Sequence, residues 1–237
     1  MPIDLQAAFD QASATVQLAF EINPVFSGDS PAPGELIEAI NQFFSIYQKL
    51  GNEPEKNQSF SKDSISQIGE QTISCLVELS VWADKLELHK EKAILDEVAL
   101  AVAHWVIRHR GEIRSLQAIV DMLAAKANQT SDKQVLTALF HVMNDVIEQA
   151  APELKTDQDK SDPGRPWRML NFNFAIVATR TMNRDLMTRA FDTLGRNLPE
   201  DCPQFFEEGL SQSEKAVYGP EIKTMMAEYF KKWATLH

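Results

Sequence analysis

The chain has 237 residues, of which 44% are hydrophobic and 24% are charged, a balance typical of a folded protein. The formal net charge of −11 argues against binding to nucleic acid or to an anionic membrane surface, because both repel an acidic protein. The charge is uneven: residues 1–160 hold 13 Lys and Arg against 24 Asp and Glu, whereas residues 161–237 hold ten of each.

Three features of the sequence indicate the cellular compartment in which the protein is expected. The opening MPIDLQAAFDQ lacks the basic and apolar regions of a signal peptide. The longest apolar stretch, which begins at Ala93, carries two acidic residues and a histidine, so we expect no membrane span. Two cysteines, Cys75 and Cys202, are too few for a disulfide framework. A cytoplasmic protein with reduced thiols is the resulting expectation.

Helical periodicity runs through nearly the whole chain. Apolar residues at three- and four-residue steps predict a first helix from Leu5 to Phe20, ended by Asn23-Pro24, and a second from Leu36 to Tyr47. Eight more helical segments are expected from Lys62 onward, and the last two run from Pro203 and from Pro220. No segment shows the sustained alternation of a half-buried strand.

Two segments of the chain can be laid over each other without a gap. Residues 129–154 align with residues 180–205 at a constant offset of 51, which places Thr130 on Thr181, Phe140 on Phe191 and Pro152 on Pro203. Each copy contains a polar turn, an amphipathic helix and a proline that stops it. Such self-similarity predicts stacked helical hairpins.

The predicted fold is all-α, with about ten helices in five antiparallel αα-hairpins. This layout resembles tetratricopeptide or HEAT-type repeats and would form a superhelix, although the tetratricopeptide signature is missing. An irregular helical bundle is the alternative. We predict one domain over 1–237, with a possible division into an acidic part, 1–154, and a C-terminal part, 167–237, joined by the charged linker 155–166.

The sequence contains no recognised catalytic or cofactor motif. The five histidines and two cysteines lack the spacings of a zinc or di-iron site, and no glycine-rich phosphate loop is present. Asp157-x-Asp159-x-Ser161 opens like a calcium loop, but Asp162 stands where that loop needs glycine, so we interpret the segment as a solvated linker. We expect no enzyme activity, no cofactor and no metal.

Six arginines lie between Pro163 and Asn197, against only two acidic residues. Arg189 and Arg196 alternate with these acids at helical spacing, which predicts weak surface ion pairs. The remaining arginines, together with an amide in an apolar helix, predict a groove for a carboxylate or an acidic peptide. The proposed partner-binding residues are Arg168, Asn171, Arg180 and Arg184.

Our first hypothesis is therefore a non-enzymatic, cytoplasmic interaction module that binds a protein or acidic peptide, and neither nucleic acid nor a membrane. Asn171 could instead satisfy buried groups of the fold itself. A second hypothesis is a ligand carrier or enzyme with an internal pocket near His104, Asp121, His141 and Asp145. A third is a structural homodimer formed through the C-terminal helix.

Overall fold

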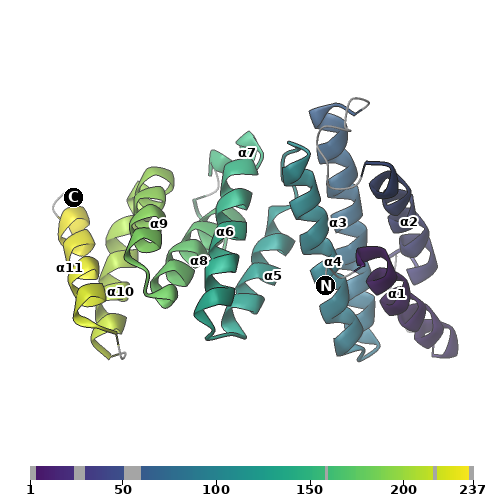
Figure 1. The fold of residues 1–237 in the computed structure, drawn as a ribbon, viewed down its shortest axis with the longest axis horizontal. Helices are drawn as coiled ribbons and strands as arrows, with labels where there is room; N and C mark the ends of the chain where they lie inside the picture. Colours follow the sequence, from purple (N-terminus) through teal and green to yellow (C-terminus); the bar gives the residue numbers. More distant parts are fainter. Residues whose placement is uncertain (1–3, 24–29, 51–59, 158–159, 216–217, 235–237) are drawn as a thin grey trace. The chain divides into compact units, whose positions relative to one another are not determined.

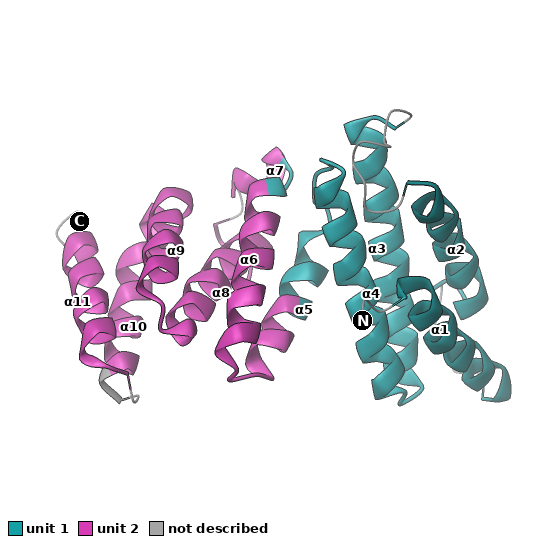
Figure 2. Cartoon of the chain, viewed as in Figure 1, with its two compact units in different colours: residues 1–122, 149–151 teal, residues 123–148, 152–237 magenta. Residues whose placement is uncertain are grey.

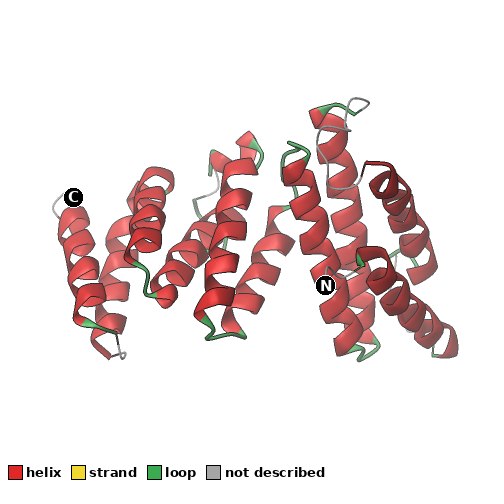
Figure 3. Ribbon diagram, viewed as in Figure 1, coloured by secondary structure: helices red, strands yellow, loops and turns green. Residues whose placement is uncertain are grey.

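The computed structural model describes residues 4–23, 30–50, 60–157, 160–215 and 218–234. Within these ranges the chain folds into α-helices without an extended strand, which confirms the all-α prediction (Figure 1 and Figure 3). The elements in chain order are α1 (Leu5–Ile22), α2 (Pro33–Leu50), α3 (Lys62–Lys85), α4 (His89–Arg108), α5 (Leu116–Asn128), α6 (Lys133–Gln149), α7 (Pro152–Lys155), α8 (Pro166–Thr181), α9 (Arg184–Asn197), the 3-10 turn η2 (Pro199–Asp201), α10 (Cys202–Lys215) and α11 (Pro220–Ala234). The four-residue helix α7 is one that the periodicity does not predict.

The chain divides into two compact units (Figure 2). Unit 1 comprises residues 1–122 and 149–151, and unit 2 comprises residues 123–148 and 152–237. The division falls within α5, so the segment 155–166, proposed as a linker from the sequence, lies inside unit 2. Residues 149–151 join unit 1 because Ile113 forms an isolated backbone bridge with Ala150.

Unit 1 is a cluster of four long helices. The α3 and α4 helices pack against each other, and α1 packs against α4 as well as α2. Aromatic side chains fill the centre: Phe9 of α1 lies 5.2 Å from Phe44 of α2, and Phe43 meets Trp105 of α4 edge-on at 5.2 Å. Such pairs add to the apolar burial that holds the helices together. Because α1 contacts α4 directly, unit 1 resembles a bundle more than a row of hairpins.

Unit 2 is built mainly from consecutive helix pairs. The α8 helix packs on α9, and α10 packs on α11. Phe140 of α6 stacks on Phe174 of α8 with ring centroids 4.4 Å apart, and Phe191 of α9 meets Phe206 of α10 at 5.1 Å. All four rings are fully buried. Phe140 and Phe191, which the 51-residue offset aligns, thus each contact a phenylalanine of another helix.

The same offset relates the turns that begin α6 and α9. Asp132 caps α6 by accepting hydrogen bonds from the backbone N–H groups of residues 134 and 135, and Asn183 caps α9 through residues 185 and 186. Before each cap, a threonine hydroxyl accepts from the backbone N–H of the capping residue at 3.1 Å, Thr130 in the first turn and Thr181 in the second. Equivalent residues therefore satisfy the free N–H groups of both helix starts in the same way.

Ion pairs of low exposure lie at both ends of the segment predicted to be a solvated linker, and residues 160–164 between them are exposed. Arg165 donates from Nε to Asp157 at 2.6 Å and from Nη2 to Asp201 at 3.0 Å. Arg168 adds a third bond, from its Nε to the second oxygen of Asp201 at 2.7 Å. The hydrogen bond to Asp157, with the nearby charge of Asp201, raises the pKa of Arg165. The carboxylate of Asp157 therefore binds a guanidinium, and Asp159 of the same motif lies outside the described residues.

Candidate functional site

Two of the side chains predicted to bind a partner, Arg168 and Asn171 of α8, form hydrogen bonds with other residues of unit 2. Asn171 is fully buried, donates to the carbonyl oxygen of Trp167 at 2.9 Å and accepts from the amide of Asn197 at 2.7 Å. Arg168 is engaged by Asp201 through the ion pair described above. The buried-amide alternative for Asn171 is the arrangement observed, so this residue is out of reach of a partner.

Of the other two predicted residues, Arg180 is hydrogen-bonded within unit 2 and Arg184 is exposed. Arg180 donates to the carbonyl oxygens of Ala127 and Thr130, at the end of α5, where carbonyl groups lack intrahelical partners. Arg184 is exposed, and no hydrogen bond or ion pair joins its side chain to another described residue. Arg168 and Arg180 also lie about 18 Å apart along α8, at 1.5 Å per residue. The four side chains thus do not converge into one surface.

The prediction of surface ion pairs along α9 is wrong for the described residues. Arg189 is paired with neither Asp185 nor Asp192, and its Nη2 lies 3.3 Å from Glu148 of α6. Arg196 donates to a threonine of its own helix at 3.0 Å. Asp192 accepts a hydrogen bond from α11 instead. Arg189 thus pairs with an acceptor on another helix in place of a neighbour at helical spacing.

These two arginines border a groove of about 360 Å³ in unit 2, lined by residues of α6, α7, α8 and α9. Lys155 of α7 and Arg189 and Arg196 of α9 supply three cations to its lining, and Glu148 of α6 supplies one carboxylate. The charged lining residues therefore sum to +2, in a chain whose net charge is −11. We call this feature the basic groove.

The rest of the basic groove is formed by side chains of low exposure. Four of them are buried, namely Asn144, Ile147, Trp167 and Thr193. Glu148 contacts two of the three cations: its carbonyl oxygen accepts from Lys155 at 2.6 Å, and its carboxylate lies 3.3 Å from Nη2 of Arg189 and accepts from Asn144 at 3.0 Å. An anion that enters the groove would meet side-chain donors that are already oriented.

The indole of Trp167 has an unmet hydrogen bond. Its side chain is 4% exposed, and Nε1 is buried without an acceptor among the described residues. Buried N–H groups are nearly always paired, and an unpaired one costs about 1–3 kcal/mol. Because Trp167 lines the basic groove, an oxygen of a bound ligand is one source of the missing acceptor.

The three arginines predicted from the sequence to bind a partner, Arg168, Arg180 and Arg184, are not among the described lining residues of this groove. Arg189 and Arg196 are seven residues apart, which places both on one face of α9, and that spacing was the available signal. Trp167 and Lys155 carried no such signal, because their position beside α9 depends on how four helices pack.

The residues proposed for an internal pocket are divided between the units. Asp121 and His104 belong to unit 1, and His141 and Asp145 belong to unit 2. Of these four, His104 lines a described cavity, between α1, α2 and α4. Among the described residues, no cluster of three histidine, cysteine or acidic side chains is arranged to hold a metal ion.

Comparison with known proteins yields no relative. No protein-family model matches the chain, no curated protein matches it, and no solved structure matches it. In the part of the chain that the structure describes, every helix is too short or too polar to cross a membrane. The functional argument therefore rests on the geometry of the chain itself.

Proposed function

We propose that the protein is a non-enzymatic, cytoplasmic interaction module of helical hairpins, and that unit 2 binds an acidic segment of a protein partner in the basic groove. The observation that carries the proposal is a cationic lining in an acidic chain. Arginine presents a planar fork that matches a carboxylate with two parallel hydrogen bonds, so Arg189 and Arg196 suit Asp or Glu side chains. The free thiols of Cys75 and Cys202 are compatible with a reducing compartment.

A peptide suits this groove better than a small free anion. Asn144 and Asn197 place amide groups beside the cations, and side-chain amides can bond to an extended peptide backbone. The unpaired indole N–H of Trp167 adds a donor for a backbone carbonyl or a carboxylate. A volume of about 360 Å³ accommodates a few side chains of a longer segment that continues beyond the groove.

The test is fluorescence anisotropy of labelled nine-residue peptides rich in Glu and Asp, titrated with the full chain. The variant Arg189→Gln/Arg196→Gln removes both forks and should weaken binding at least about tenfold, because charge-assisted hydrogen bonds contribute roughly 1.5–3 kcal/mol each. Trp167→Phe keeps the ring but removes the N–H, and should weaken binding by roughly three- to tenfold.

The matched control is Arg184→Gln, which removes an exposed positive charge from the same helix. It should leave the affinity within about twofold, since a single exposed charge is screened by salt. Equal binding by the wild type and the double variant would refute the proposal, as would an absence of binding to any acidic peptide. Competition by citrate or phosphate as strong as that by the peptide would show that the groove binds free anions instead.

A further inference from the structure

The three cations of the basic groove differ in the acceptors that they meet. Arg189 pairs with the carboxylate of Glu148, but the two side chains are 50% and 58% exposed, and such a pair contributes little. Lys155 donates to a backbone carbonyl, and Arg196 donates to the hydroxyl of Thr193. Among the described residues, neither of these two cations forms an ion pair. Their charges are therefore available to an anion in the groove.

Two buried side chains that line the basic groove add donors without an acceptor. Trp167 is 4% exposed, and its indole N–H is unpaired among the described residues. Thr193 is 7% exposed, and its hydroxyl accepts from Arg196 but donates to no described acceptor. Arg189 and Arg196 each use a single N–H of the guanidinium in their described contacts. The groove thus offers more donors than the fold itself uses.

The charge of the basic groove suits a doubly charged anion better than a single carboxylate. The charged lining residues sum to +2, whereas the side chain of Asp or Glu carries one negative charge on two oxygens. A phosphate monoester carries about −1.5 to −2 at neutral pH and has three acceptor oxygens. It would therefore neutralise Lys155 and Arg196 together and still present an oxygen to the free donor of Trp167 or Thr193.

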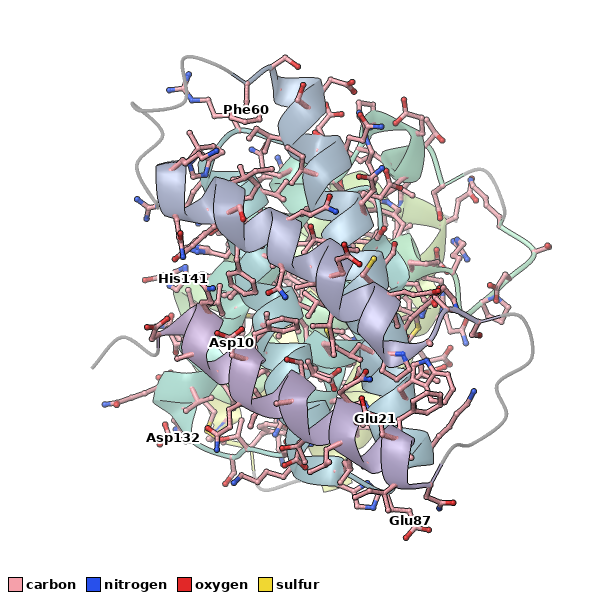
Figure 4. All side chains as sticks on the ribbon, turned by 90° about the vertical axis from the view of Figure 1, so that its right-hand side faces the viewer. Asp10, Glu21, Phe60, Glu87, Asp132 and His141 are labelled. Carbon is pink, nitrogen blue, oxygen red and sulfur yellow. The ribbon has the colours of Figure 1, made fainter. Side chains whose placement is uncertain are left out.

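The acidic residues that repel an anion belong mainly to unit 1. Unit 1 holds 18 Asp and Glu against nine Lys and Arg, whereas unit 2 holds 16 against 14. Figure 4 looks onto α1 of unit 1 and shows Asp10 and Glu21 along this helix, and both side chains are exposed. A field of one sign lowers the local concentration of like-charged ligands. The nearly balanced charge of unit 2 therefore opposes a dianion less than the charge of unit 1 does.

Building on the proposed function, we infer that a phosphorylated serine or threonine anchors the acidic segment in the basic groove. The phosphate group pairs with Lys155 and Arg196 and accepts a hydrogen bond from Trp167. Arg189 binds an acidic residue of the same segment. Of the described lining residues, Glu148 alone is negative, and it opposes the phosphate by repulsion and by competing for Arg189. Phosphorylation of the partner thus strengthens its binding.

The experiment compares three acidic peptides of one nine-residue sequence whose central residue is serine, glutamate or phosphoserine. Each is labelled and titrated with the full chain at neutral pH, with fluorescence anisotropy as the readout. The phosphoserine peptide should bind at least about tenfold more tightly than the serine peptide and about fivefold more tightly than the glutamate peptide, because additional charge-assisted hydrogen bonds form.

The same comparison at about pH 5.5 tests the second charge of the phosphate. Its second pKa is about 6, so most of the dianion is lost at this pH, whereas the glutamate peptide stays largely ionised. The preference for phosphoserine over glutamate should therefore shrink by at least about twofold. An unchanged preference would overturn the inference.

Two variants of opposite effect test the site. Lys155→Gln/Arg196→Gln removes the two cations without an ion pair and should reduce the preference for phosphoserine over glutamate to below about twofold. Glu148→Gln removes the negative charge of the lining and should tighten binding of the phosphoserine peptide by about threefold, a gain that misfolding cannot produce. The control Arg184→Gln removes an exposed charge from α9 and should keep the preference. Circular dichroism verifies the fold of each variant.

The outcomes separate this inference from the proposed function. Equal binding of the three peptides would overturn the phosphate anchor and leave the basic groove as a site for acidic segments, whereas binding of none would refute both. A double variant that keeps the preference, or a Glu148→Gln variant that binds no more tightly, would also overturn the inference. Competition as strong as that of the phosphopeptide would overturn it as well, by inorganic phosphate in favour of a free anion, and by single-stranded DNA in favour of a nucleic acid.

Discussion

Replacing Arg165 by Met should destabilise unit 2 more than the loss of an ordinary surface charge. The side chains of Arg165, Asp157 and Asp201 are only 10%, 7% and 18% exposed. Removing one partner of a buried pair leaves the other charge uncompensated, at a cost of about 3–5 kcal/mol. Asp201 keeps its bond to Arg168, so we expect the lower end of this range, about 3 kcal/mol, mainly from the stranded Asp157.

Urea unfolding followed by far-UV circular dichroism measures this loss, and a loss of about 3 kcal/mol corresponds to a melting temperature lower by roughly 6–12 °C for a chain of this size. The control is Lys160→Met, which removes the Lys160–Glu200 pair from the same segment, where the side chains are 55% and 69% exposed. That variant should lose less than about 1 kcal/mol.

The double variant Asp157→Asn/Arg165→Met tests the cause. Once the stranded carboxylate is neutral, part of the stability should return, so the double variant should be more stable than Arg165→Met alone. A loss below about 1 kcal/mol for Arg165→Met would refute the reasoning, as would a double variant no more stable than the single one.

Three further predictions concern thiols and glycines. Because Cys202 is fully buried and Cys75 is partly exposed, a thiol reagent should label Cys75 in the native protein and Cys202 only upon unfolding. Burial raises the pKa of the Cys202 thiol from 9.0 to about 12, so its contribution to stability is complete below pH 9 and is lost as the pH rises toward 12. The unfolding free energy should therefore fall by up to about 1.4 kcal/mol per pH unit in this window, and Cys202→Ala should flatten that slope in urea titrations. Gly69→Ala should lower the melting temperature, because the new Cβ would lie 2.1 Å from a methyl group of buried Val106, at a cost of about 1–3 kcal/mol. Gly219→Ala should leave the melting temperature unchanged, because its Cβ would meet nothing within 4 Å. Equal melting temperatures for the two variants would contradict the packing argument.

The prediction of an all-α fold succeeded because its determinants are local. Apolar residues at helical spacing placed the helices correctly, and the polar turns expected before α6 and α9 contain their caps, Asp132 and Asn183. The 51-residue offset located the equivalent turns before α6 and α9 for the same reason. A capping side chain bonds to backbone N–H groups two or three residues away, so a short local sequence pattern is enough to predict it.

The candidate site was harder to predict because an arginine's partner is chosen in three dimensions. Arg180 reaches the end of α5, about 50 residues earlier in the chain, and Arg189 reaches Glu148, 41 residues earlier. A long guanidinium side chain bonds to whichever acceptor packing brings near, and helical spacing shows only the acceptors on its own helix. For this reason the sequence assigned Arg189 to a surface ion pair and Arg180 to a binding surface.

The sequence alone thus determined the fold class, most helix positions and the starts of α6 and α9, since each depends on interactions between near neighbours. Tertiary structure decided which charges are buried, which arginines border the basic groove and which residues of α1, α2 and α4 line a cavity. The physical reason is distance along the chain: these features arise where residues far apart in sequence pack together, and each depends on side chains that no single helix contains.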